Sequence, residues 1–204
     1  MKFLNLSHRG LTSLDGIDLS GVTILYCDNN KLTTLPTLPD ELTVLECESN
    51  KLTSLPNLPQ NLVRLWCCNN SLTSLPYLPD NLTELSCEEN KLTSLPFLPD
   101  GLVDLWCYSN KLTTLSHIPG SLMTLSCFNN NLPLPLPNDV GKSINKDQLD
   151  EIKLIHHNIM RKDLGLPIVN KITNSKEIRG QWKIWQYRPD GEKYNIAKQC
   201  IEQN

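Results

Sequence analysis

A period of 20 residues dominates this sequence and limits the folds that it can form. From Leu25 onward a leucine, a cysteine and an asparagine recur in six consecutive units without gaps. A first, atypical unit starts at Leu4 and is one residue longer, which gives seven units. One unit of this length cannot bury its apolar residues alone, so the period predicts a solenoid whose stacked units share a continuous core. The recurring residues are Cys27, Cys47, Cys67, Cys87, Cys107 and Cys127, with Asn30, Asn50, Asn70, Asn90, Asn110 and Asn130.

Each part of the unit has its own predicted conformation. Apolar and polar residues alternate in Leu45-Glu46-Cys47, which predicts a short strand with Leu45 and Cys47 directed inward. Stacked strands of this kind form a parallel sheet with neighbours about 4.8 Å apart. The asparagine that follows can donate and accept, so a column of asparagines can pair backbone groups where the chain bends. The Leu-Pro-x-Leu-Pro segment cannot be helical, because proline lacks an N–H group, and we expect it to run extended, near polyproline II.

The complete motif is Leu-x-x-Leu-x-Cys-x-x-Asn-x-Leu followed by x-x-Leu-Pro-x-Leu-Pro, as in residues 42–59. It resembles the leucine-rich-repeat family, and most of all the short repeats of secreted effectors of bacterial pathogens (the YopM and IpaH type). Similar repeats occur in proteins of giant viruses that infect amoebae. The resemblance covers residues 3–137. It implies a solenoid of the α/β-horseshoe class, with a parallel sheet on the concave face and an extended convex side, and a scaffold that holds a partner protein against the sheet.

Eight cysteines in a chain of 204 residues raise the question of disulfides or zinc. Six of them share one inward column, where cysteine packs as a small apolar residue. Zinc sites use Cys-x-x-Cys pairs from different loops, and the sequence contains none. We therefore expect structural packing, with neither a metal site nor a cofactor. Cys68 stands at an outward position, and a free thiol there suits a reducing compartment, the cytoplasm, including that of a host cell.

The outward positions of the strands are where function is expected, because the other columns form the core. Acidic residues dominate these positions, and Arg64 is their lone basic residue. Large aromatic residues share the same face, and such residues are enriched among interface hot spots. The opposing interpretation is that the aromatic side chains pack on each other or on the C-terminal segment. The residues predicted to contact a partner are Tyr26, Glu46, Glu48, Arg64, Trp66, Glu84, Glu88, Asp104, Trp106, Tyr108 and Phe128.

Charge is unevenly distributed along the chain. Residues 1–137 hold 7 Lys and Arg against 13 Asp and Glu, whereas residues 138–204 hold 12 against 9. An acidic, aromatic trough suits a basic or amphipathic segment of a partner protein. It disfavours nucleic acid, whose phosphates need a cationic surface.

Residues 138–204 leave the repeat and are expected to form a C-terminal cap. Apolar residues at helical spacing predict a helix at about 146–164, and an alternating segment before a turn sequence predicts a hairpin at about 181–197. If this segment does more than cover the last repeat, the chain is an adaptor that recruits an enzyme to a client bound by the repeats. A third and weaker hypothesis is a nucleic-acid-binding tail, with Trp182, Trp185 and Tyr187 stacking on bases.

Nothing in the sequence forms a constellation for catalysis. His156 and His157 have no evident cysteine or serine nucleophile beside them. Some bacterial proteins with similar repeats carry a ubiquitin-ligase domain with a Cys-x-Asp motif, which Cys200-Ile201-Glu202 does not match. No apolar run approaches the roughly 18–20 residues that a membrane helix needs. We therefore predict a non-enzymatic protein-binding module that does not enter a membrane; its oligomeric state is not specified by the sequence.

Overall fold

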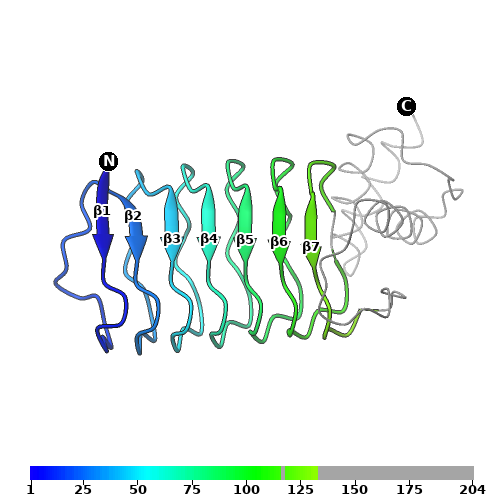
Figure 1. Cartoon of the computed structure of the whole chain (residues 1–204), viewed down its shortest axis with the longest axis horizontal. Coiled ribbons are helices and arrows are strands. Elements are labelled where there is room, and N and C mark those ends of the chain that lie inside the picture. Colours follow the sequence, from blue (N-terminus) through cyan, green and yellow to red (C-terminus); the bar gives the residue numbers. More distant parts are fainter. Residues whose placement is uncertain (116–117, 133–204) are drawn as a thin grey trace, which may run out of the picture. The chain divides into compact units, whose positions relative to one another are not determined.

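One parallel sheet runs through the part of the protein that the computed structural model describes, residues 1–115 and 118–132. Its seven strands lie in chain order, each paired with the next (Figure 1). Successive strands point the same way because each unit returns on the far side before the next strand begins. The strands are β1 (Lys2–Asn5), β2 (Val22–Tyr26), β3 (Val44–Glu46), β4 (Arg64–Trp66), β5 (Glu84–Ser86), β6 (Asp104–Trp106) and β7 (Thr124–Ser126).

The pairing register follows the sequence period. From β2 onward each residue pairs with the residue 20 positions later, as Leu45 does with Leu65. Between β1 and β2 the register shifts after Lys2, and from Phe3 onward the offset is 21, with Leu4 paired to Leu25, which accommodates the longer first unit. The ladder continues past the strands, since the Cys47 N–H donates to the Trp66 carbonyl at 2.8 Å. Constant register places equivalent side chains in rows across the sheet, about 4.8 Å apart.

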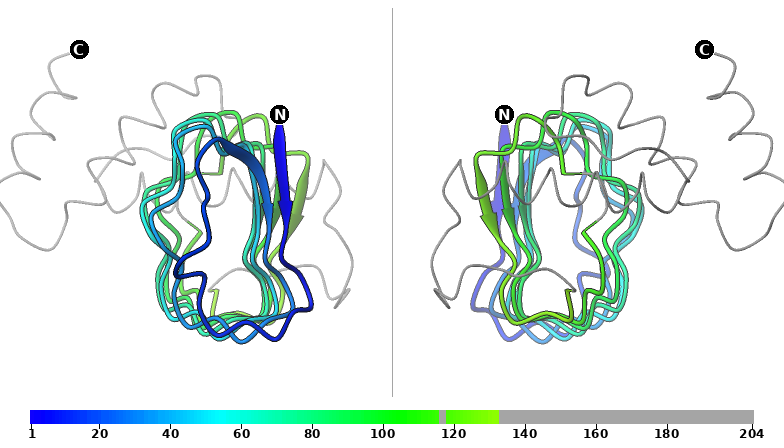
Figure 2. Two further views of the ribbon diagram at one scale, coloured as in Figure 1. Left: turned by 90° about the vertical axis from the view of Figure 1, so that its left-hand side faces the viewer. Right: turned by 90° about the vertical axis from the view of Figure 1, so that its right-hand side faces the viewer.

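The core is built from the inward columns that the period predicts. Leu45 and Cys47 are completely buried, and so are Leu52 and Leu62 of the return segments. Figure 2 looks along the stack and shows the strands on one side of the turns and the return segments on the other. Burying one leucine contributes about 1.5–3 kcal/mol relative to leaving it exposed. Each leucine reaches that burial only between neighbouring units, so the units fold as a stack. The predicted solenoid is confirmed.

A column of asparagines joins consecutive units behind the strands. The Asn70 side-chain N–H group donates to the carbonyl of Cys47 at 3.1 Å and to that of Cys67 at 3.2 Å. Its side-chain oxygen accepts from the Leu52 N–H at 2.9 Å. The same arrangement recurs at Asn50, Asn90, Asn110 and Asn130. The predicted role of this column, pairing backbone groups where the chain turns, is confirmed.

The return segments contain no helix in residues 1–115 and 118–132, as expected from their prolines. No helix within these ranges is long and apolar enough to cross a membrane. The predicted helix at about 146–164 and the predicted hairpin at about 181–197 lie outside the described residues. So does the predicted domain boundary at residue 137.

Candidate functional site

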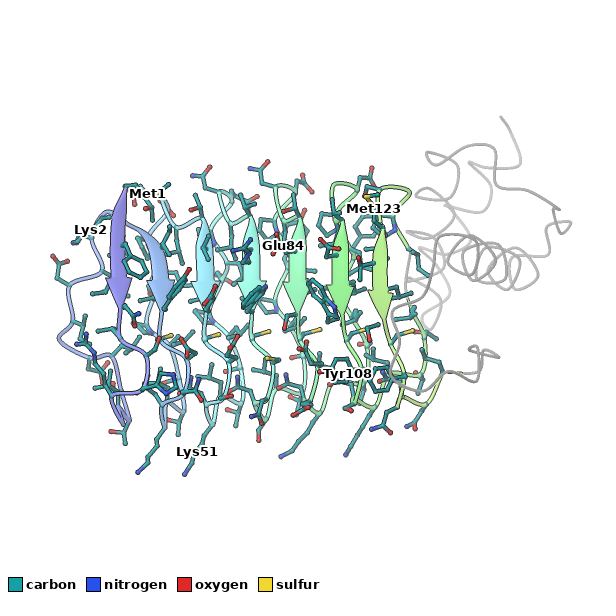
Figure 3. The ribbon with its side chains drawn as sticks, viewed as in Figure 1. Met1, Lys2, Lys51, Glu84, Tyr108 and Met123 are labelled. Carbon is teal, nitrogen blue, oxygen red and sulfur yellow. The ribbon has the colours of Figure 1, made fainter. Side chains whose placement is uncertain are left out.

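The face of the sheet that points away from the core carries three rows of side chains, and we call it the outer sheet face (Figure 3). The first row stands where the strands begin, the second where they end, and the third directly after the buried cysteines. The rows are Ile24, Val44, Arg64, Glu84, Asp104 and Thr124; Tyr26, Glu46, Trp66, Ser86, Trp106 and Ser126; and Asp28, Glu48, Cys68, Glu88, Tyr108 and Phe128. All eleven residues predicted to contact a partner therefore lie on this one face.

Two pairs of aromatic rings are in contact at the ends of the outer sheet face. Tyr108 and Phe128 stack in parallel, with ring centroids 4.5 Å apart and planes 6° apart. Phe3 and Tyr26 meet edge to face at 5.0 Å and 81°. Phe3 is 54% exposed, and the sequence analysis did not include it because it belongs to the atypical first unit. The expectation that aromatic side chains pack on each other holds for these four rings, whereas Trp66 and Trp106 lie two strands apart.

Arg64 is held by its neighbours on the outer sheet face. Its Nε donates to Oε2 of Glu84 at 2.6 Å, and its Nη2 donates to Oε1 at 3.0 Å. Its guanidinium carbon also lies 5.3 Å from the ring centroid of Trp66, which is cation–π range. The hydrogen bond that Arg64 donates to Glu84 is the main reason that the pKa of Arg64 is raised. The lone basic side chain of this face is therefore paired, and so is the carboxylate of Glu84.

Three other carboxylates of this face lack a basic partner. Within residues 1–115 and 118–132, no basic side chain lies within 4.0 Å of Glu46, Glu48 or Glu88. Partial burial raises the pKa of each, and neighbouring negative charges add to that effect. For Glu46 those charges are Glu48 and Asp28. Arg64 partly offsets the charge of Glu46. No nearby basic group offsets the charges of Glu48 and Glu88 among the described residues.

Asp28 belongs to this acidic group, although the sequence analysis did not select it. Its side chain is 13% exposed and accepts a short hydrogen bond from the Ser7 hydroxyl. The Asn29 side chain donates to its second oxygen at 2.9 Å, and His8 lies 3.7 Å away. Its alignment with Glu48 and Glu88 in the third row is the signal that could have identified it.

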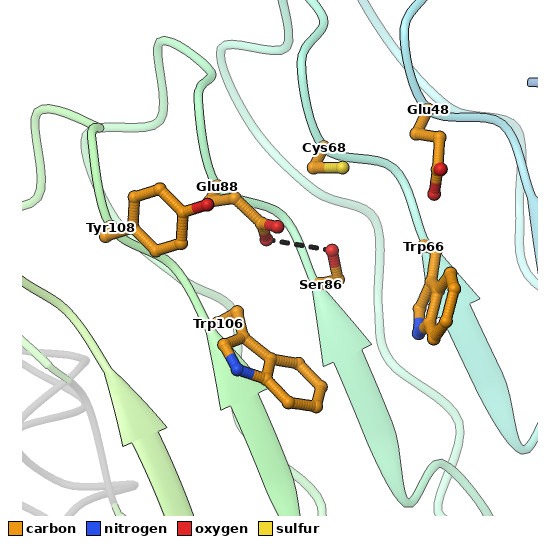
Figure 4. Close-up of a pocket in the computed structure, with 7 residues that line it drawn as sticks. All are labelled: Glu48, Trp66, Cys68, Ser86, Glu88, Trp106 and Tyr108. Carbon is orange, nitrogen blue, oxygen red and sulfur yellow. Dashed lines mark hydrogen bonds between the residues drawn. The ribbon is translucent and has the colours of Figure 1, made fainter. Parts of the chain in front are cut away.

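A pocket of about 370 Å3 opens on the outer sheet face over strands β4, β5 and β6 (Figure 4). It exists because Ser86 is small and stands between Trp66 and Trp106 in the same row. The Ser86 hydroxyl donates to Oε2 of Glu88 at 2.8 Å. Trp66 Nε1 is buried and has no hydrogen-bond partner among the described residues. The pocket is lined by Glu48, Trp66, Cys68, Ser86, Glu88, Trp106 and Tyr108.

The thiols on and beneath this face are held in the protonated form. Burial raises the pKa of Cys68 to about 12, and the charge of Glu88 adds to the shift. The same cause raises the pKa of Cys27 and of Cys127 to about 12. All seven cysteines in the described part of the chain are free. Because the thiolate is the reactive form, Cys68 is a poor nucleophile at neutral pH. No group of three metal-ligating side chains occurs in residues 1–115 and 118–132.

No protein-family model and no curated protein matches the sequence, whereas solved structures do. A leucine-rich-repeat domain of a Shigella effector is 35% identical over 65% of this chain and 70% of its own, with a TM-score of 0.55. The chain belongs to the leucine-rich-repeat family. Within this family, YopM from Yersinia enterocolitica is 41% identical over 54% of this chain, with a TM-score of 0.54. YopM from Yersinia pestis is 30% identical over 63% of this chain, with a TM-score of 0.55.

These leucine-rich-repeat relatives confirm the predicted resemblance to bacterial effectors, while the resemblance to giant-virus proteins stays a prediction. The chain spans 25% of the length of the Yersinia enterocolitica protein and 43% of that from Yersinia pestis. The relationship indicates a repeat module that binds proteins.

Proposed function

We propose that this leucine-rich-repeat chain is a non-enzymatic module that holds a partner protein against its outer sheet face. The observation that carries the proposal is the pocket between Trp66 and Trp106, which borders on Glu48 and Glu88. Large aromatic side chains around a recess supply the apolar anchor points that interface hot spots use. The protonated thiol of Cys68 offers no nucleophile here, and its reduced state is in keeping with a cytoplasmic setting.

The proposed partner presents a basic or amphipathic segment to this face. Glu48 and Glu88 have no basic partner among the described residues. Arg64 is bound to Glu84 and only partly offsets the charge of Glu46. Opposite charges across an interface mainly raise the association rate, and salt screens them with a Debye length of about 8–10 Å at 0.1–0.15 M. Capture that weakens as salt is raised is therefore the expected behaviour. A nucleic acid would bring phosphates against these carboxylates, which opposes binding.

Affinity capture from a eukaryotic cell lysate, followed by mass spectrometry, tests the proposal. The intact chain is compared with a variant that carries Trp66→Ser, Trp106→Ser and Tyr108→Ser. The matched control is Tyr77→Ser, because Tyr77 is an aromatic residue on a return segment and is 61% exposed. Circular dichroism and thermal unfolding verify that both variants fold. We expect the triple variant to lose specific proteins that the control retains.

A second variant tests the same site in case the triple variant fails to fold. Glu48→Gln with Glu88→Gln keeps the shape of both side chains and removes only their charge. This variant should retain less of the same partner, by about fivefold at 0.1 M salt, which corresponds to roughly 1 kcal/mol for the paired charges. If the triple variant, the charge variant and Tyr77→Ser all capture the same proteins as the intact chain, the outer sheet face is not the binding site.

A further inference from the structure

The molecule already contains one guanidinium bound by an indole and a carboxylate. The guanidinium carbon of Arg64 lies 5.3 Å from the Trp66 ring centroid, and Glu84 accepts two hydrogen bonds from it. Aromatic ring and carboxylate come from neighbouring strands, β4 and β5. Arg64 is therefore an example of an arginine side chain that this face binds with an indole and a carboxylate.

The pocket offers the same kinds of group without a cation. Neither Arg64 nor Glu84 lines it, so that pair does not fill it. Figure 4 shows Trp66 and Trp106 on the two sides of Ser86, with Glu88 hydrogen-bonded to Ser86 and Glu48 beyond Trp66. Among the described residues no basic side chain lies within 4.0 Å of either glutamate. Two indoles and two carboxylates thus border a recess that no basic side chain of residues 1–115 and 118–132 lines, although Arg64 lies against the Trp66 ring.

The spacing of the strands suits a cation between the two indoles. Trp66 and Trp106 are in register on β4 and β6, with only β5 between them. Two strand spacings separate their backbones by about 9.6 Å. When both rings stand above their own strands, a cation midway between them is about 5 Å from each, inside the 6 Å range over which an aromatic face attracts a positive charge. A larger residue in place of Ser86 would fill this gap.

We propose that this pocket binds the arginine side chain of a partner protein, with the guanidinium between Trp66 and Trp106 and its N–H groups directed to Glu88. The proposal rests on the proposed function and names the chemistry that the site recognises. Glu88 already accepts from the Ser86 hydroxyl, from the Cys68 thiol and from its own backbone N–H. A carboxylate has about four acceptor sites, so one remains for a guanidinium N–H group. Tyr108 and Glu48 complete the rim, and Glu48 adds negative charge without a required contact.

Arginine fits these groups better than lysine does. A guanidinium is planar, stacks on aromatic rings and is weakly hydrated, so it loses little solvation between two indoles. An ammonium group is compact and strongly hydrated and has no flat face to stack on an indole, so it loses more solvation in this recess. Trimethyllysine would satisfy the rings but would leave Glu88 without a donor.

The test uses the full-length protein labelled with nitrogen-15 and the indole N–H signals of its four tryptophans. Trp66→Phe and Trp106→Phe assign the two signals of the pocket. The probes are capped tripeptides, Gly-X-Gly, in which X is arginine, citrulline, lysine or trimethyllysine. They are added to about 20 mM, since one side chain is expected to bind with a dissociation constant near 1 mM or weaker. Citrulline has the shape of arginine without its charge.

We expect the arginine peptide to shift both pocket signals and to bind about fivefold more tightly than the citrulline peptide. Glu88→Gln should weaken arginine binding about threefold or more while preserving the unbound spectrum. Glu41→Gln is the matched control, because Glu41 is exposed on the turn before β3 and does not line the pocket. It should leave the affinity unchanged.

Several outcomes would overturn the assignment. These are equal binding of the arginine and citrulline peptides, tighter binding of lysine or trimethyllysine, absence of any shift at about 20 mM, or equal effects of Glu88→Gln and Glu41→Gln. Failure here is distinguishable from failure of the proposed function. If the arginine preference is absent but partner capture still depends on the outer sheet face, only the arginine assignment falls. If arginine binds but no variant changes partner capture, the proposed function falls instead.

Discussion

The carboxylate of Glu84 accepts two hydrogen bonds from the guanidinium of Arg64, at 2.6 and 3.0 Å, across strands β4 and β5. This pair orders the outer sheet face next to the pocket, because the same guanidinium lies against Trp66. It also removes one carboxylate from the charge that a partner meets. The two side chains are 36% and 26% exposed, so solvent weakens their attraction without abolishing it.

A double-mutant cycle on Arg64→Ala and Glu84→Ala should give a coupling free energy of about 0.5–1 kcal/mol at low salt. The reason is that the geometry is bidentate but the pair is only half-buried. Urea unfolding of the four proteins measures it. Raising the salt to about 1 M should reduce the coupling. A coupling of zero at low salt would show that the pair does not hold in solution.

The raised pKa values of Glu46, Glu48 and Glu88 predict an unusual dependence of stability on pH. Each group binds a proton more readily in the folded chain than in the unfolded chain, where its pKa is near 4.5. Ionisation therefore disfavours the folded state, and the destabilisation is fully present above the raised pKa values. As pH falls toward 4.5, these three groups should contribute progressively less destabilisation.

The triple variant Glu46→Gln, Glu48→Gln, Glu88→Gln tests this directly. We expect a higher free energy of unfolding than that of the natural chain at pH 7, with the difference shrinking as pH is lowered toward 4.5. Comparing the two proteins at each pH cancels the titration of every other group. A variant that is less stable at pH 7, or a difference that grows on acidification, would contradict the assigned direction of the pKa shifts.

The asparagine column should be far more important for stability than its polar composition suggests. Asn90 is 9% exposed, donates to the carbonyls of Cys67 and Cys87, and accepts from the Leu72 N–H. Asn90→Ala leaves these buried backbone groups unpaired, at about 1–3 kcal/mol each for any that water does not reach. We expect a loss of about 2–4 kcal/mol in the free energy of unfolding.

Asn81→Ala is the matched control for this loss. The Asn81 side chain also donates to a backbone carbonyl, that of Gln60 at 3.0 Å, but the bond is exposed. Water can replace it, so its removal should cost less than about 1 kcal/mol. Equal losses at both positions in urea unfolding would mean that burial does not set the role of the asparagine column.

The fold could be predicted from the sequence because its period fixes which residues share a column. Inward leucines, buried cysteines and the asparagine column all follow from that period and from side-chain chemistry. The first unit was harder, since Phe3 lies in a unit that is one residue longer and pairs out of step. Its contact with Tyr26 depends on that shifted register.

The outer sheet face could be predicted as a set of residues but not as a site. The rows place Trp66, Ser86 and Trp106 side by side, yet the sequence does not say which side chains meet. The rows do predict the pairing of Arg64, since Arg64 stands directly opposite Glu84, whereas Glu46 stands opposite Trp66. The rows do not predict that the guanidinium also lies on the Trp66 ring, because that contact depends on side-chain conformations.

One backbone feature was missed for a different reason. The residue before each column asparagine, and its equivalent His8 in the first unit, adopts positive φ, and none of the seven is glycine. They are His8, Asn29, Ser49, Asn69, Glu89, Ser109 and Asn129, with φ between 50° and 58°. Asparagine tolerates this left-handed conformation better than most residues do, whereas glutamate does not. The period shows that these seven positions are equivalent. Their residue types are too varied to indicate a left-handed conformation.

Glu89→Asn should therefore stabilise the chain by about 0.5–1 kcal/mol. Glu89 has φ of 52°, and its N–H donates to the Tyr108 carbonyl at 3.0 Å, so the turn holds it in this conformation. The reverse change, Asn69→Glu, is the matched experiment at an equivalent position with φ of 50° and should destabilise by a similar amount. Urea unfolding at pH 7 measures both. Changes of the same sign in the two variants would show that backbone conformation does not govern this column.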